Sequence, residues 1–198
     1  MESLSEVTLE EFEAELVPAQ IRPLQIVYAA CAQWLLAIGA VLAILEVQGL
    51  LRPPDRSSGV GSLAIVLTLA TLATFCVLHW LAHWLSARQL SPERLARAAR
   101  GEWYPVLGPA ARSPAGACLN LIRKTLFLRL VCYDAAATLG VAALVAAGIL
   151  GALREHPVLW LNLLPAAALL GHIVFAFPTR GRLRALFLES IAAARRPI

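Results

Sequence analysis

The stretch SSGVGSLAIVLTLATLATFCVLHWLAHWLSA (residues 57–87) contains no Asp, Glu, Lys or Arg. A helix of about 20 apolar residues crosses a hydrocarbon layer about 30 Å thick, so this stretch is long enough to span a membrane. Three further stretches also lack all four charged residue types: residues 23–45, 135–153 and 156–179. The sequence therefore predicts an all-α integral membrane protein with four transmembrane helices.

The overall composition agrees with this prediction. Apolar residues make up 59% of the chain and charged residues only 15%, whereas a soluble domain carries about a quarter charged residues. A soluble bundle would also need polar outward faces at helical period, which the stretches 57–87, 135–153 and 156–179 hardly offer. The N-terminal MESLSEVTLEEFEAEL (residues 1–16) is acidic, the reverse of the positive start of a signal peptide. We therefore expect neither a soluble bundle nor a cleaved signal.

The basic residues predict the orientation. Of 17 Lys and Arg residues, 14 lie before residue 23, between the uncharged stretches 57–87 and 135–153, or after residue 179. Cytoplasmic loops of membrane proteins carry such an excess, so both termini and the middle loop are predicted to be cytoplasmic in a multi-pass protein of the bacterial inner membrane. The net charge of +4 suits anionic lipid headgroups. The lipid bilayer is therefore an expected partner, and nucleic acid is not.

The predicted helices form two in–out–in hairpins. They cover about residues 23–51, ending at RPPD, then 62–85, 125–153 and 158–177, with a kink at Pro165. The predicted segments are an acidic cytoplasmic N-terminal segment (1–20), a first transmembrane hairpin (21–86), a basic cytoplasmic loop (87–122), a second transmembrane hairpin (123–179) and a basic amphipathic tail (180–198).

Short helices are predicted outside the membrane. TLEE (residues 8–11) matches a capping box, and the helix that it starts should end at Pro18 and lie on the membrane surface or against the middle loop. SPERLARAAR (91–100) matches a short basic helix that begins at a Ser–Pro pair. In the tail, an apolar stripe with arginines beside it predicts an interfacial amphipathic helix. The stripe residues are Leu183, Leu186, Phe187 and Ile191.

The two hairpins resemble an internal repeat. IRPLQIVYAACAQWLLAIG (residues 21–39) aligns without a gap on IRKTLFLRLVCYDAAATLG (122–140), with identities at the paired Ile, Arg, Cys and Gly positions. Gly39 then falls on Gly140, and Gln33 on Asp134. Parallel repeats of this kind are related by an axis along the membrane normal.

The repeat predicts one polar layer inside the membrane. Each hairpin places a polar residue in each helix at a similar distance from the cytoplasmic arginines, and a helix rises about 1.5 Å per residue. An ionisable group in a membrane usually faces the bundle interior and has a partner. The layer residues are Gln33, His79, Asp134 and His172.

Several roles remain open for this layer. Asp134 could fix helix register through a hydrogen bond to a histidine, to a glutamine or to Thr138, or it could extend to the headgroups. It could carry protons or cations with His79 or His172 as its partner. The two histidines could also clamp a b-type haem, or Cys76, His79 and Asp134 could bind zinc or copper. The sequence predicts no bound cofactor, and the haem and metal sites stay alternatives.

Small residues predict a packing face on the third helix. Small residues repeated at spacings of three and four positions let helix backbones approach closely, within one protein or between two copies of it. We expect Gly39 and Ala43 to provide the opposing surface. The residues of the face are Cys132, Ala136, Gly140, Ala143, Ala147 and Gly151. This packing face predicts that the protein forms a homo-oligomer or is a subunit of a larger membrane complex.

Two resemblances follow from these motifs. DAAATLGVAAL (residues 134–144) is similar to the ion-carrying helix of rotor-ring c subunits, in which a carboxylate precedes a glycine by six positions, as Asp134 precedes Gly140. Residues 20–186 look like a group of small bacterial four-helix membrane proteins with a basic residue and a carboxylate opening helix three, and FPTR-like residues (177–180) closing helix four. The first resemblance implies ion handling, and the second implies no activity.

No signature of a soluble enzyme is present, since the sequence has no phosphate-binding glycine loop, nucleophile elbow or HExxH motif. We therefore do not expect an enzyme. The leading interpretation is a structural or accessory membrane subunit that assembles through small-residue helix faces. The first alternative is proton or cation handling through Asp134 with His79 or His172, and the second is a haem- or metal-binding subunit.

Overall fold

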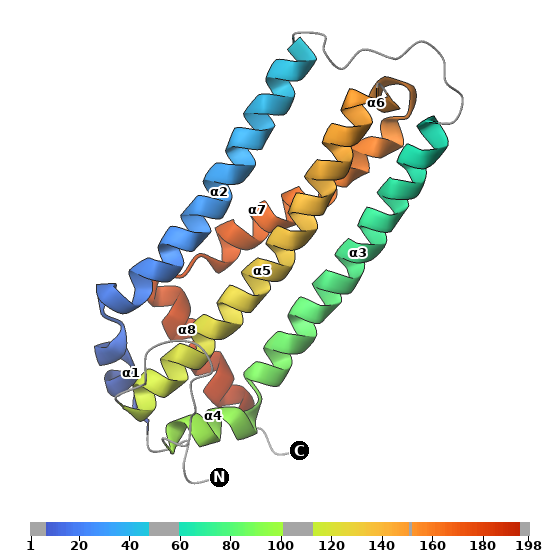
Figure 1. Cartoon of the computed structure of the whole chain (residues 1–198). Coiled ribbons are helices and arrows are strands. Elements are labelled where there is room, and N and C mark those ends of the chain that lie inside the picture. Colours follow the sequence, from blue (N-terminus) through green and yellow to red (C-terminus); the bar gives the residue numbers. More distant parts are fainter. Residues whose placement is uncertain (1–6, 48–59, 101–112, 151, 195–198) are drawn as a thin grey trace. The chain divides into compact units, whose positions relative to one another are not determined.

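The structure is a computed structural model that describes residues 7–47, 60–100, 113–150 and 152–194. This described part is built of helices and contains no β-strand (Figure 1). In chain order the elements are α1 (Leu9–Glu15), α2 (Pro18–Val47), α3 (Val60–Gln89), α4 (Pro92–Ala99), α5 (Pro114–Ile149), α6 (Ala152–Glu155), the 3₁₀ helix η2 (Pro157–Leu163), α7 (Leu164–Ala176) and α8 (Arg180–Ala194).

Four helical segments are long and apolar enough to cross a membrane, as judged by their length and composition. The prediction of an all-α protein with four such segments is confirmed to that extent. The segments are Pro18–Ile44, Ser62–Gln89, Pro114–Ile149 and Pro157–Ala176.

The third long helix begins earlier than predicted. α5 starts at Pro114, inside the segment expected to be a loop, rather than near Thr125. Ser113 precedes it, and its hydroxyl accepts a hydrogen bond from the backbone N–H of Gly116 at 2.9 Å. A Ser–Pro pair is a favourable helix start. The same signal correctly placed the start of α4 at Pro92, so it was available here too.

The fourth span is divided rather than kinked. Residues Pro157–Leu163 form η2, and the α-helical part begins only at Leu164. Pro165 is therefore the second residue of α7 instead of an interior one. In the first turn of a helix the N–H that proline lacks has no intrahelical partner to lose. The predicted bounds of about 158–177 agree with the candidate span Pro157–Ala176, but the prediction of a kink at an interior Pro165 was wrong for this reason.

The chain divides into two compact units. Unit 1 comprises Met1–Val27, His83–Arg129 and Ala176–Ile198, and unit 2 comprises Tyr28–Ala82 and Leu130–Phe175.

In unit 1, α1 packs against α8. The TLEE capping box is confirmed, because the side chains of Thr8 and Glu11 each accept a hydrogen bond from the other residue's backbone N–H. Phe12 is fully buried and stacks on Phe187, with ring centroids 4.0 Å apart. Arg184 and Glu13 form an ion pair at 3.0 Å.

These contacts revise the expectation for the C-terminal helix, whereas the expected contact of α1 with the middle loop is present, because the Ser113 hydroxyl donates to Oε1 of Glu15. Leu183, Phe187 and Ile191 of the apolar stripe on α8 are buried and Leu186 is half-buried, so protein covers much of the stripe. Two stacked aromatic rings stabilise a contact by more than the burial of their apolar area alone. This stabilisation favours packing of α1 on α8 over separate surface helices. α1 ends at Glu15, and Pro18 begins α2.

In unit 2, an apolar core joins four elements. Ala64 of α3, Leu144 of α5, Leu153 of α6 and Leu159 of η2 belong to one buried cluster. Gly151 of the predicted packing face and the RPPD break (residues 52–55) lie outside the described residues.

Candidate functional site

Two tyrosines connect the histidines of the predicted polar layer in unit 2. The hydroxyl of Tyr133 on α5 forms a hydrogen bond with Nδ1 of His79 on α3 at 2.9 Å. The hydroxyl of Tyr28 on α2 lies 3.2 Å from Nε2 of His172 on α7. The rings of Tyr133 and His172 stack with centroids 4.8 Å apart. We call Tyr28, His79, Tyr133 and His172 the tyrosine–histidine cluster.

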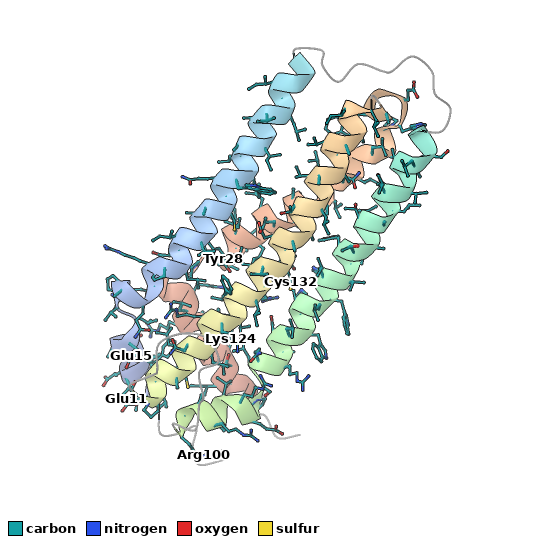
Figure 2. The ribbon with its side chains drawn as sticks, viewed as in Figure 1. Glu11, Glu15, Tyr28, Arg100, Lys124 and Cys132 are labelled. Atoms are coloured by element: carbon teal, nitrogen blue, oxygen red, sulfur yellow. The ribbon has the colours of Figure 1, made fainter. Side chains whose placement is uncertain are left out.

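The tyrosines are the buried members of this cluster. Tyr28, labelled in Figure 2, has no exposed surface, and Tyr133 is also buried, whereas His172 is half-buried and His79 is exposed. A buried phenol normally finds a hydrogen-bond partner, and the imidazoles supply one here. Sequence reasoning found the histidines by their depth but missed both tyrosines, although Tyr133 directly precedes Asp134.

Asp134 has a different neighbour from those expected. The Cys31 thiol of α2 is within side-chain hydrogen-bonding range of the Asp134 carboxylate. Thr138 does bond to residue 134, but its hydroxyl donates to the main-chain oxygen at 2.9 Å. This is the local bond that Thr forms inside helices. Asp134 therefore lies next to the cluster in sequence but has the Cys31 thiol of α2 as its neighbour.

Gln33 lies apart from the other three layer residues. Its side chain is exposed on α2, and within the described residues it forms no hydrogen bond with the cluster. The repeat register that paired Gln33 with Asp134 therefore does not give the two residues equivalent surroundings.

The small-residue face of α5 packs against the fourth span. Ala136, Gly140 and Ala147 are buried, and Cys132 and Ala143 are half-buried. A methyl group added at Gly140 would overlap the main-chain oxygen of Asn162 and would lie 3.3 Å from Cγ of Pro165. The backbones of α5 and η2 therefore approach each other closely at Gly140.

The expected opposing surface on α2 does not take part in this packing. Gly39 and Ala43 are both exposed, and nothing lies within 4 Å of a methyl group added at Gly39. Within one chain these two residues therefore do not oppose the small-residue face, and their contact with a second copy stays a prediction. Apolar composition alone does not tell which helix a small-residue face meets.

Asn162 is a buried polar residue that sequence reasoning missed. It has no exposed surface, and its side-chain nitrogen donates to Thr68 Oγ1 at 2.8 Å and to the Leu159 main-chain oxygen at 2.9 Å. The bond to Thr68 links η2 to α3. A lone asparagine in an uncharged stretch is the signal that could have found it, since amides often join helices in membranes.

The geometry does not fit the haem clamp that the sequence left open as an alternative. Tyr133 forms a hydrogen bond with His79 and stacks on His172, so its ring occupies the place of a flat macrocycle between the two imidazoles. For the metal alternative, no group of three or more His, Cys, Asp or Glu side chains suited to a metal ion is found among the residues that the structure describes.

Comparisons of the chain with protein-family models, with curated proteins and with solved structures gave no match.

Proposed function

We propose that this protein is a structural subunit of the bacterial inner membrane that assembles with a second copy of itself through one face of α2. In this proposal the four spans form two in–out–in hairpins with both termini in the cytoplasm. The four long apolar helices and the location of 14 of the 17 Lys and Arg residues support the placement. The exposed Gln33 carries the assembly argument.

The face around Gln33 has the spacing of a helix-packing seam. Its residues are separated by four, three, four and three positions, the repeat of left-handed helix pairs, and all of them are exposed. α2 is also the least buried of the four candidate spans. We call this surface the α2 face; it consists of Ala29, Gln33, Leu36, Ala40 and Ala43.

The chemistry of Gln33 favours a second copy as the partner. A polar side chain in a transmembrane segment rarely faces lipid, because lipid offers no hydrogen bond. A primary amide carries both donors and an acceptor, so two glutamines related by a two-fold axis satisfy each other. Alanines on either side let the backbones approach closely.

Replacing Gln33 with leucine tests this assembly. We expect the dimer to dissociate about tenfold more readily, because one interhelical amide bond in a membrane is worth about 1–2 kcal/mol. Native mass measurement of the detergent-extracted protein at a series of concentrations gives the dimer fraction.

Matched variants separate the α2 face from general effects. Ala40→Leu should also weaken the dimer by bulk, whereas the same change at the exposed Ala70 of α3 should leave it intact. Gln33→Asn, which keeps the amide, should retain most of the dimer. A wild-type protein that is monomeric throughout, or a dimer that survives both Gln33→Leu and Ala40→Leu, would contradict the proposal.

The tyrosine–histidine cluster supports proton handling as a second candidate function. Four titratable side chains from four helices are in contact there, in segments otherwise nearly without charge. Histidine exchanges protons near neutral pH, and a tyrosine hydroxyl both donates and accepts. This candidate moves the centre of the predicted relay from Asp134 to Tyr133.

Tyr133→Phe tests the second candidate because it removes one oxygen and keeps the stacked ring. If the cluster carries protons, their flux into liposomes should fall about tenfold or more without loss of assembly. Asp134→Asn is the comparison, since a relay through the carboxylate would lose flux there instead. Flux through the wild-type protein no faster than through empty liposomes would exclude both routes.

A further inference from the structure

The C-terminal part of α3 and the middle of α5 bring cationic and imidazole groups together within unit 1. Arg129 Nη2 lies 3.3 Å from His83 Nδ1. Arginine only donates hydrogen bonds, so the imidazole nitrogen accepts and this contact supplies no negative charge. The contact therefore orients the guanidinium without neutralising it.

The described part of the chain gives Arg129 no acidic partner. Over residues 7–47, 60–100, 113–150 and 152–194, no carboxylate forms an ion pair with Arg129, and its Nε is buried without a hydrogen-bond partner among these residues. A partly buried guanidinium with unused donors is costly in a membrane protein unless an anion reaches it.

Neighbouring residues place this pair at headgroup level in a bilayer. Trp84 follows His83 directly, is 42% exposed, and has the guanidinium of Arg88 lying 5.2 Å from its ring centroid. Tryptophan gathers where hydrocarbon meets headgroups. Arg88 is also the first charged residue after the uncharged stretch 57–87, so the chain enters the polar region at this point.

We propose that Arg129, positioned by His83, binds the phosphate of an anionic phospholipid. The planar guanidinium matches a phosphate with two parallel hydrogen bonds, and basic sites between transmembrane helices on the cytoplasmic side are suited to such headgroups. A lipid fits better than a free phosphate, because its acyl chains lie along the apolar surface of the same helices. The inference rests on the membrane placement in the proposed function but not on the dimer.

Lipid binding by the detergent-extracted protein tests the inference. Native mass measurement with phosphatidylglycerol and phosphatidylcholine should show preferential retention of phosphatidylglycerol by the wild-type protein. Arg129→Gln should weaken that retention about tenfold, because a charge-assisted pair is removed. Arg182→Gln, which removes the same charge from an exposed position on α8, should change it less than about twofold.

Three outcomes would overturn the inference: equal losses in the two glutamine variants, no preference for phosphatidylglycerol in the wild-type protein, or displacement of the lipid by millimolar inorganic phosphate. Arg129→Lys covers the case in which Arg129→Gln does not fold. It keeps the charge but lacks the planar fork, so an unchanged lipid affinity in this variant would also overturn the inference. The same spectra give the dimer fraction, so failure of the dimer and failure of the lipid site are distinguished.

Discussion

Gly140→Ala is expected to lower the free energy of unfolding by about 3 kcal/mol, at the upper end of the cost of overpacking a core. The added methyl group would overlap the main-chain oxygen of Asn162 and meet the ring of Pro165 at 3.3 Å. Both contacts belong to backbone or to a rigid ring, so neither gives way by a rotamer change. The α5 backbone or the η2–α7 junction has to move.

Two other glycines provide matched controls for this variant. Nothing lies within 4 Å of a methyl group added at Gly39 of α2 or at Gly171 of α7. Alanine is the better helix former by about 1 kcal/mol, so Gly171→Ala should leave stability unchanged or raise it. Gly39 occupies the position equivalent to Gly140 in the sequence repeat, which makes the comparison a test of the repeat as well.

Thermal unfolding in detergent, followed by tryptophan fluorescence, measures these differences. The expected order is a lower midpoint for Gly140→Ala than for either control. If all three variants have the same midpoint temperature of unfolding, the close approach of η2 to α5 at Gly140 is not present in the protein.

Asn162→Ala is expected to lower the free energy of unfolding by about 2 kcal/mol, because the variant loses hydrogen bonds and leaves a cavity. The Asn162 side-chain nitrogen donates to Thr68 and to the Leu159 main-chain oxygen. Removing it leaves the buried Leu159 oxygen with one partner fewer. It also uncouples η2 from α3.

Two threonines of α3 make this prediction specific. Thr68 and Thr74 each donate to the main-chain oxygen four residues earlier at 2.9 Å, but Thr68 also accepts from Asn162. Thr68→Val should therefore cost more than Thr74→Val. In a double-mutant cycle, Asn162→Ala and Thr68→Val should show a coupling energy of about 1 kcal/mol, whereas Asn162→Ala and Thr74→Val should be additive. Additivity in both cycles would contradict the bridge between η2 and α3.

Local capping signals in the sequence correctly predicted where α1 and α4 begin. The capping box at Thr8 and the Ser–Pro start at Pro92 are both present, because capping depends only on residues within a few positions of each other. The start of α5 at Pro114 carries the same kind of signal. For the fourth span, Pro165 indicated that the helix changes near this residue. The sequence did not show that the residues before it form a 3₁₀ helix.

The candidate site was predicted less completely. The depth argument brought out His79 and His172, and both prove to contact Tyr133. It did not reveal Tyr28, because a tyrosine hydroxyl carries no charge, or Asn162, because this residue lies ten positions before His172 and so outside the depth of the predicted layer. Cys31 as the neighbour of Asp134 was equally invisible, since that contact joins two helices.

The sequence by itself determined that four long apolar helices form, because the length of an uncharged stretch and its backbone hydrogen bonds are local properties. Only the tertiary structure decided which faces of those helices meet. Helices that are apolar all round have no periodic signal to mark the packed side, so side-chain shape and single polar contacts make the choice. Gly140 against η2 and Tyr133 between two histidines are such contacts, whereas Gln33 on α2 remains exposed.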